Sequence, residues 1–102
     1  MTDTALTPLR DLVLARRDEI KAIVARHSGR AVAIFGSVAR GDERPGSDID
    51  FLVELEPSAR PFEILAIGVE LEEALGVRVD VGTRASLRNH LRDAVLAEAV
   101  VL

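Results

Sequence analysis

Two short apolar runs, separated by a polar connection, constrain the fold of this chain most strongly. Residues 31–35 end directly at Gly36, and residues 49–55 follow a stretch rich in glycine and charge. Runs of this length are long enough for buried strands and too short for helices. Between them, residues 38–40 can form only about one helical turn before Gly41. We therefore expect two strands of one sheet, joined through a glycine turn and a single helical turn.

Helical periodicity flanks these strands on both sides. Thr7 and Pro8 predict a helix start, and a helical apolar pattern continues from there to Gly29, which we expect to end the helix. Pro61 is expected to open a second long helix, which Gly76 ends. Its predicted buried positions are Phe62, Ile64, Leu65, Ile67, Gly68, Val69, Leu71 and Leu75.

The last part of the chain predicts a further strand and a closing helix. Residues 77–81 alternate apolar and polar side chains, which is typical of a half-exposed strand ending at Gly82. Thr83 or Ser86 is expected to cap the final helix. The order of elements predicts an α/β (α+β) fold, in which helices pack on a small mixed sheet of at least three strands. We expect one domain over residues 1–102.

Composition excludes several classes of function. The chain has 102 residues, no cysteine and a net charge of −4, which excludes thiolate metal sites and cysteine nucleophiles and argues against direct nucleic-acid binding. With three Phe and neither Trp nor Tyr, it lacks aromatic platforms for stacking bases. Acidic residues interrupt the N-terminal region, and no apolar run approaches the ~18 residues of a membrane span. We expect a cytoplasmic protein with no membrane contact.

Two carboxylates at the start of the second predicted strand point to metal chemistry. Alternate strand residues share a face, so Asp48 and Asp50 lie on one side while Ile49 and Phe51 point into the core. At roughly 5 Å and an effective dielectric of about 20, such charges repel by on the order of 3 kcal/mol, which a cation would offset. Carboxylate oxygens suit Mg²⁺. Asp80 lies on the face of the third strand that points away from the core. If the second and third strands are neighbours, three carboxylates converge and could hold two metal ions.

The glycine turn before the helical turn has the features of a phosphate site. Gly36 allows a sharp turn and close approach of a ligand, and Ser37 offers a hydroxyl beside the amides that open the helical turn. Arg40 could bind a phosphate, or equally pair with Asp42 or Glu43 on the surface. Each motif alone is usually structural in proteins. Their combination with a third aspartate favours a functional site.

These motifs resemble the nucleotidyltransferase superfamily related to polymerase beta, and most closely its minimal single-domain (MNT) branch. The matching segments are residues 36–41, residues 47–50 and Asp80 in its Val-Asp-Val context. The resemblance implies Mg²⁺, with two ions expected, and ATP as the nucleotide donor. The implied catalytic and metal-binding residues are Asp48, Asp50 and Asp80, and the implied nucleotide contacts are Gly36, Ser37, Arg40 and Ser47.

The resemblance also implies a partner. Members of this branch are commonly antitoxins encoded beside a HEPN-domain ribonuclease toxin, and some transfer AMP from ATP to a tyrosine of that toxin. We expect this reaction here, with a partner protein completing the acceptor site, and the sequence is compatible with an oligomer. Two alternatives stay open. One is an antitoxin that neutralises by binding alone, through its last helix and residues 100–102; the other is a transferase for a small molecule such as an aminoglycoside.

Overall fold

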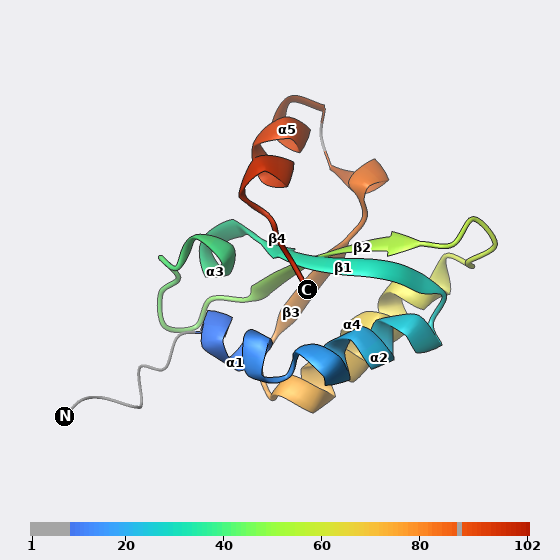
Figure 1. Cartoon of the computed structure of the whole chain (residues 1–102), viewed down its shortest axis with the longest axis horizontal. Helices are drawn as coiled ribbons and strands as arrows, with labels where there is room; N and C mark the ends of the chain where they lie inside the picture. Colours follow the sequence, from blue (N-terminus) through green and yellow to red (C-terminus); the bar gives the residue numbers. More distant parts are fainter. Residues whose placement is uncertain (1–8, 88) are drawn as a thin grey trace.

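The computed structural model describes residues 9–87 and 89–102 (Figure 1). The predicted helix start at Thr7 and Pro8 lies outside the described residues. None of the described helices is long and apolar enough to cross a membrane. The elements in chain order are α1 (Leu9–Ala15), α2 (Arg17–Arg26), β1 (Gly29–Phe35), α3 (Gly36–Arg40), β2 (Ile49–Leu55), α4 (Phe62–Leu75), β3 (Val79–Gly82), the 3₁₀ turn η2 (Arg84–Ser86), α5 (Asn89–Glu98) and β4 (Val100–Val101).

Four strands form one mixed sheet in the order β3-β2-β1-β4. β1 runs antiparallel to both β2 and β4, whereas β2 and β3 are parallel. The predicted mixed sheet is therefore confirmed, and β2 has the predicted bounds. β4 was not predicted, because two apolar residues are too few for a period to distinguish a strand from the end of a helix.

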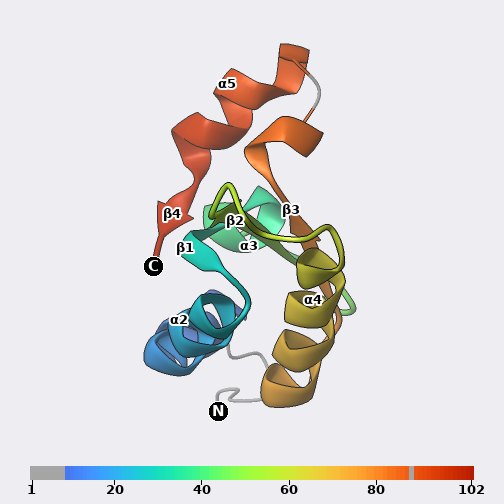
Figure 2. The ribbon, with the colours of Figure 1, turned by 90° about the vertical axis from the view of Figure 1, so that its right-hand side faces the viewer.

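The helices cover the sheet unequally. α2 and α4 pack against one face, with α1 in contact with α2 and α3, while α5 lies over the other face (Figure 2). The core lies in the first of these layers, where Ile49, Phe51 and Val53 of β2 are at most 1% exposed. Since side chains alternate along a strand, Asp50 and Leu52 face the opposite side. The second face of the sheet thus carries both the Asp50 carboxylate and the apolar side chain of Leu52.

The N-terminal helical region differs from the prediction in two places. It breaks into two helices at Arg16, whose side chain donates to the carbonyl of Ala74 at 2.9 Å. It also ends at Arg26, so Gly29 opens β1 instead of capping a helix. A Cβ on Gly29 would lie 2.1 Å from Cγ1 of Val24. The close approach of β1 to α2 therefore requires glycine here, not the end of the helix.

The second long helix begins and ends as predicted, but its buried face is narrower. Gly76 ends α4 in the left-handed conformation at φ 73°, and its N–H donates to the carbonyl of Glu72. A helix with apolar residues on several faces packs only one of them against the sheet, and its sequence does not say which. Three predicted core residues are instead exposed: Phe62 (59%), Leu65 (72%) and Val69 (50%).

The predicted cap of the final helix belongs to the element before it. The Ser86 hydroxyl accepts the N–H of Thr83 at 3.0 Å and donates to the Thr83 carbonyl at 2.8 Å. These contacts stabilise η2, and α5 begins only at Asn89. The correction arises because both residues are good cap formers and a three-residue 3₁₀ turn has no periodicity to reveal it.

A polar cluster joins the end of α2 to α4. His27 Nδ1 lies 3.3 Å from Glu63 Oε1, its Nε2 contacts the Glu70 carboxylate, and Arg26 donates to Glu70 at 2.5 Å. The hydrogen bond with Glu70 raises the pKa of His27. The same bond, together with the one from Arg26, lowers the pKa of Glu70. Both shifts favour the charged forms, so the cluster stabilises the fold when both groups are ionised.

We expect the free energy of unfolding to fall on both sides of a middle pH range. The His27 contribution is complete below its ordinary pKa of 6.5 and is lost as pH rises through its raised folded pKa. The Glu70 contribution is complete above 4.5 and is lost as pH falls through its lowered pKa. Urea unfolding at a series of pH values measures this. His27→Gln should flatten the alkaline side, and an unaltered alkaline side would contradict the assignment.

Candidate active site

Asp50 and Asp80 face each other on the outward side of the sheet. The parallel register of β2 and β3 pairs these two residues directly. The alternation that buries Ile49 and Phe51 turns Asp50 away from the core. Asp80 is exposed on the neighbouring strand. The structure thus brings together two acids that are thirty residues apart in the sequence.

The electrostatics of Asp50 reflect its surroundings. Burial raises the pKa of Asp50 above its ordinary value, and the carboxylates of Asp80 and Asp48 raise it further. The positive charge of Arg40 acts in the opposite direction. Three carboxylates therefore share one electrostatic neighbourhood, and their repulsion is the kind that a bound cation relieves.

Asp48 faces an arginine in this conformation. Arg78 Nε lies 3.2 Å from Asp48 Oδ1, with the two side chains 77% and 45% exposed. The Ile49 N–H donates to the Arg78 carbonyl at 3.1 Å and keeps the segments adjacent. Among the described residues, no three acidic, His or Cys side chains are arranged to hold a metal ion. In this conformation Asp48 therefore pairs with Arg78, while Asp50 and Asp80 lie opposite each other.

Arg78 was missed by the sequence reasoning, although a signal was available. It stands two positions before Asp80, so strand alternation would place both side chains on one side. The alternation was used only to locate the acid.

Gly36 approaches the acids from β1. It follows Phe35, which pairs with Asp50 across the sheet, and its φ is +73°. A Cβ at Gly36 would lie 2.5 Å from Asp50 Oδ2. Both the backbone conformation and this contact therefore require glycine. Ser37 comes next in α3 and is half-buried.

Arg40 and Ser47, the other two residues predicted to contact the nucleotide, form interactions within the protein. Arg40 pairs with Asp42 at 3.2 Å and with Glu98 of α5 at 3.0 Å. The first pair was one of the two weighed from the sequence. The Ser47 hydroxyl accepts the N–H of Arg44 at 2.9 Å, which stabilises the turn before Asp48.

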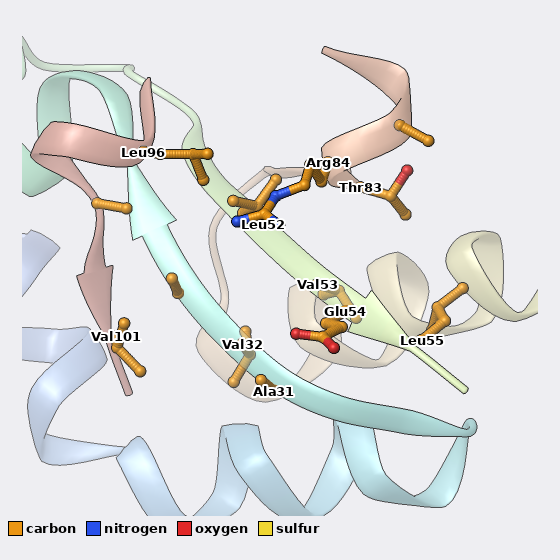
Figure 3. A pocket seen from close by; sticks show the side chains of 13 residues that line it. Ala31, Val32, Leu52, Val53, Glu54, Leu55, Thr83, Arg84, Leu96 and Val101 are labelled. Carbon is orange, nitrogen blue, oxygen red and sulfur yellow. The ribbon is translucent and has the colours of Figure 1, made fainter. Parts of the chain in front are cut away.

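A cavity of about 600 Å³ lies near the acids without being lined by Asp50 or Asp80 (Figure 3). Leu52 lies on its floor and is the next outward-facing residue after Asp50, so the cavity starts one strand repeat, about 7 Å, from that carboxylate. Leu96 of α5 forms part of the opposite wall. The Arg84 side chain extends toward Leu52 in Figure 3. Apolar walls and one guanidinium suit a planar ring.

Comparison with known proteins gives consistent matches over most of the chain. Residues 17–102 match the family model described as a nucleotidyltransferase domain. A protein of Methanocaldococcus jannaschii is 40% identical over 82 residues, which cover 80% of this chain and 88% of the relative. Protein adenylyltransferase MntA of Thermococcus cleftensis is 30% identical over 100 residues, or 98% of each chain.

Solved structures share the architecture. A structure described as a minimal nucleotidyltransferase matches with a TM-score of 0.81 at 40% identity, covering 91% of this chain and 95% of the other. A complex of a tri-AMPylated Shewanella oneidensis HEPN toxin with its MNT antitoxin matches with a TM-score of 0.65 at 18% identity, over 86% and 69% of the chains. The similarity to the complex of the HEPN toxin with its MNT antitoxin shows a shared fold alone. The predicted fold class is confirmed.

Proposed function

The chain belongs to the nucleotidyltransferase domain family, and on that premise we propose that it is a Mg²⁺-dependent protein adenylyltransferase that modifies a hydroxyl of a HEPN-type toxin. In this proposal it acts as the antitoxin. The observation that carries it is the convergence of Gly36, Asp50 and Asp80 on the face of the sheet that points away from the core. The name of the Thermococcus relative, which matches 98% of each chain, supports AMP as the transferred group and a protein as acceptor.

The acids are suited to hold the metal. Their oxygen donors match the preference of Mg²⁺, and the raised pKa of Asp50 marks a place where negative charge lacks compensation. Asp48, Asp50 and Asp80 would be the ligands, with Asp48 leaving Arg78. When bound, Mg²⁺ supplies charge neutralisation and orientation for the triphosphate. Gly36 and Ser37 bind phosphate oxygens beside it, with Arg40 and Ser47 as secondary candidates.

The transfer itself needs one proton acceptor. The acceptor oxygen attacks the α-phosphorus of ATP, the new O–P bond forms, and pyrophosphate leaves with the electrons of the broken bond. Asp80 takes the hydroxyl proton in this proposal, because it is the exposed acid of the facing pair and can be reached from outside. Asp50 is half-buried and less accessible to a partner's side chain.

The cavity beside the acids is the proposed place for the nucleoside. Its position, one strand repeat from Asp50, puts a ring there within reach of a phosphate at the acids. Leu52 and Leu96 would contact the faces of the base, and the Arg84 guanidinium would stack on it.

Filling this cavity should weaken ATP use without impairing chemistry. Leu96→Trp is expected to raise the KM for ATP by about tenfold and to change kcat by less than about twofold, because the added indole occupies the space of the base. Steady-state kinetics with saturating acceptor measures this. Leu65→Trp, on the exposed face of α4, is the matched control. Equal KM values in the two variants would place the nucleoside elsewhere.

Removing Arg78 should strengthen binding of a divalent cation. The exposed pair with Asp48 is worth at most about 1 kcal/mol, which corresponds to about fivefold in affinity. Mn²⁺ titration of Arg78→Ala without nucleotide, followed by electron paramagnetic resonance of the free ion, measures the change. Arg60→Ala alters the net charge equally and serves as control. Identical Mn²⁺ affinities in the two variants would show that Arg78 does not compete with the metal.

The proposed antitoxin role is tested by growth rescue. Cells expressing the neighbouring HEPN-domain protein should grow when the wild-type chain is co-expressed, and should fail to grow with folded Asp48→Asn or Asp80→Asn. Rescue by both variants would favour an antitoxin that acts by binding alone. Absence of rescue by the wild type would oppose an antitoxin role for this pair.

A further inference from the structure

The edge of the sheet at β1 is only partly covered. β4 pairs with β1 at Ala33 and Ile34, and the Leu102 N–H donates to the Val32 carbonyl at 2.9 Å. On their other side Gly29 pairs with Leu55 and Ala31 with Glu54 of β2, with an irregularity in the register at Arg30. No strand of the described part of the chain lies against the outer side of residues 29–31. Figure 1 shows β1 extending well past β4. Such an edge offers backbone N–H and C=O groups to an added strand.

A groove of about 440 Å³ lies along this open edge, between β1 and α2. Ala22, Val24 and Ala25 of α2 provide apolar walls, and β4 closes one end. Val101 in that closing strand is 71% exposed. The groove is lined by α2, whereas the cavity on the other side is lined by η2 and α5, and Ala31, Val32 and Val101 line both. Gly36, Asp50 and Asp80 do not line the groove, so an occupant there would leave the facing acids accessible.

Basic side chains flank this groove, although the chain has a net charge of −4. Lys21 and Arg30 line it, and both are exposed. Arg17 lies at its closed end, where Nε donates to the carbonyl of Leu102 at 3.2 Å. Arg30 also lies 3.8 Å from Glu54 and from Glu56. Such exposed pairs are weak, so these basic side chains still favour an occupant of negative charge.

We propose that this groove binds an extended acidic segment of a partner protein, which adds a strand to the sheet beside β1. The backbone of the segment bonds to the open edge at Arg30, and its carboxylates meet Lys21 and Arg30. Its apolar side chains contact Ala22, Ala25 and Val101. A second copy of this chain fits less well, because a symmetric pairing would bring the same basic residues together. Polyanions without a peptide backbone cannot complete the edge.

The test is a titration of the full ¹⁵N-labelled chain with two capped hexapeptides, one alternating glutamate with valine and one alternating lysine with valine. The glutamate peptide should shift the amide signals of Arg30, Ala31 and Leu102 and slow hydrogen exchange of the Arg30 amide. Lys21→Glu/Arg30→Glu should weaken binding by on the order of tenfold. Lys21→Glu alone, which keeps the Arg30 pairs with Glu54 and Glu56, should show part of this loss.

Arg44→Glu/Arg60→Glu is the matched control, since it changes the net charge equally at exposed positions away from the groove. This control should bind the glutamate peptide as the wild type does. Equal binding of the lysine peptide, equal losses in both double variants, or shifts confined to other faces would overturn the proposal. So would the absence of shifts at millimolar peptide, or a concentration-dependent dimer that buries the same edge.

Discussion

Asp50→Asn is expected to lower kcat for AMP transfer by at least about 10³-fold while leaving the chain folded. Metal ligation supplies several kcal/mol of charge stabilisation in phosphoryl transfer, and each 1.36 kcal/mol is about tenfold in rate. The amide keeps the shape of Asp50 but removes its charge. Because burial and the neighbouring carboxylates raise the pKa of Asp50, the ionised acid destabilises the fold at neutral pH. The variant should therefore unfold at the same or a higher temperature than the wild type.

This prediction is specific because kcat should fall while the unfolding temperature stays the same or rises. Thermal unfolding and single-turnover transfer measured on the same preparation provide both values. Asp18→Asn, at an exposed position of α2 away from the facing acids, removes one charge and should keep nearly full activity. Loss of activity with a parallel loss of stability would mean that Asp50 is structural. Full activity in Asp50→Asn would remove it from the proposed metal site.

Gly36→Ala is the second substitution for which we expect a large effect. A φ of +73° strains any residue with a Cβ by roughly 1–3 kcal/mol, and here the new atom would also lie 2.5 Å from Asp50 Oδ2. Either the turn or the carboxylate must move. We expect a loss of transfer of about 10²-fold or more, since misplacing a reacting group by about 1 Å has that effect.

Gly46→Ala separates the two causes. Gly46 has a φ of +86°, but a Cβ there would have nothing within 4 Å. This variant should show the loss of stability from strain and nearly normal activity per folded molecule. Urea unfolding and transfer kinetics on both variants give the comparison. Equal activity in Gly36→Ala and Gly46→Ala would mean that the contact with Asp50 has no part in the chemistry.

Much of the fold follows from local patterns, and the corrections arise where packing decides. β2 and the end of α4 are bounded by proline, glycine and a change of period, which are local signals. The exposure of Leu65 depends instead on which side of α4 meets the sheet. The role of Gly29 depends on how closely β1 passes Val24. Neither the side of α4 that meets the sheet nor the distance between β1 and Val24 can be obtained from sequence periodicity.

The candidate site likewise combines features that local patterns predict with features that depend on packing. Strand alternation predicted that Asp50 would face outward, and it left Asp80 dependent on whether β2 and β3 are neighbours, which they are. Gly36 was predicted from the space that a ligand needs, whereas the structure shows that the Asp50 side chain already occupies that side of it. The ion pair between Arg78 and Asp48 forms only because the residues just before β3 and just before β2 lie close together in space. The sequence pattern therefore locates the acids but not what restrains them.

The most direct test of the proposed transfer is to follow the two ends of ATP separately. The chain is incubated with Mg²⁺, the neighbouring HEPN-domain protein, and ATP labelled at either the α- or the γ-phosphate, and the protein products are analysed by intact mass. We expect AMP adducts on the partner that carry only the α-label, release of pyrophosphate, and no adduct with Asp50→Asn. Adducts that carry the γ-label, or adducts that form equally with Asp50→Asn, would contradict nucleotidyl transfer at this site.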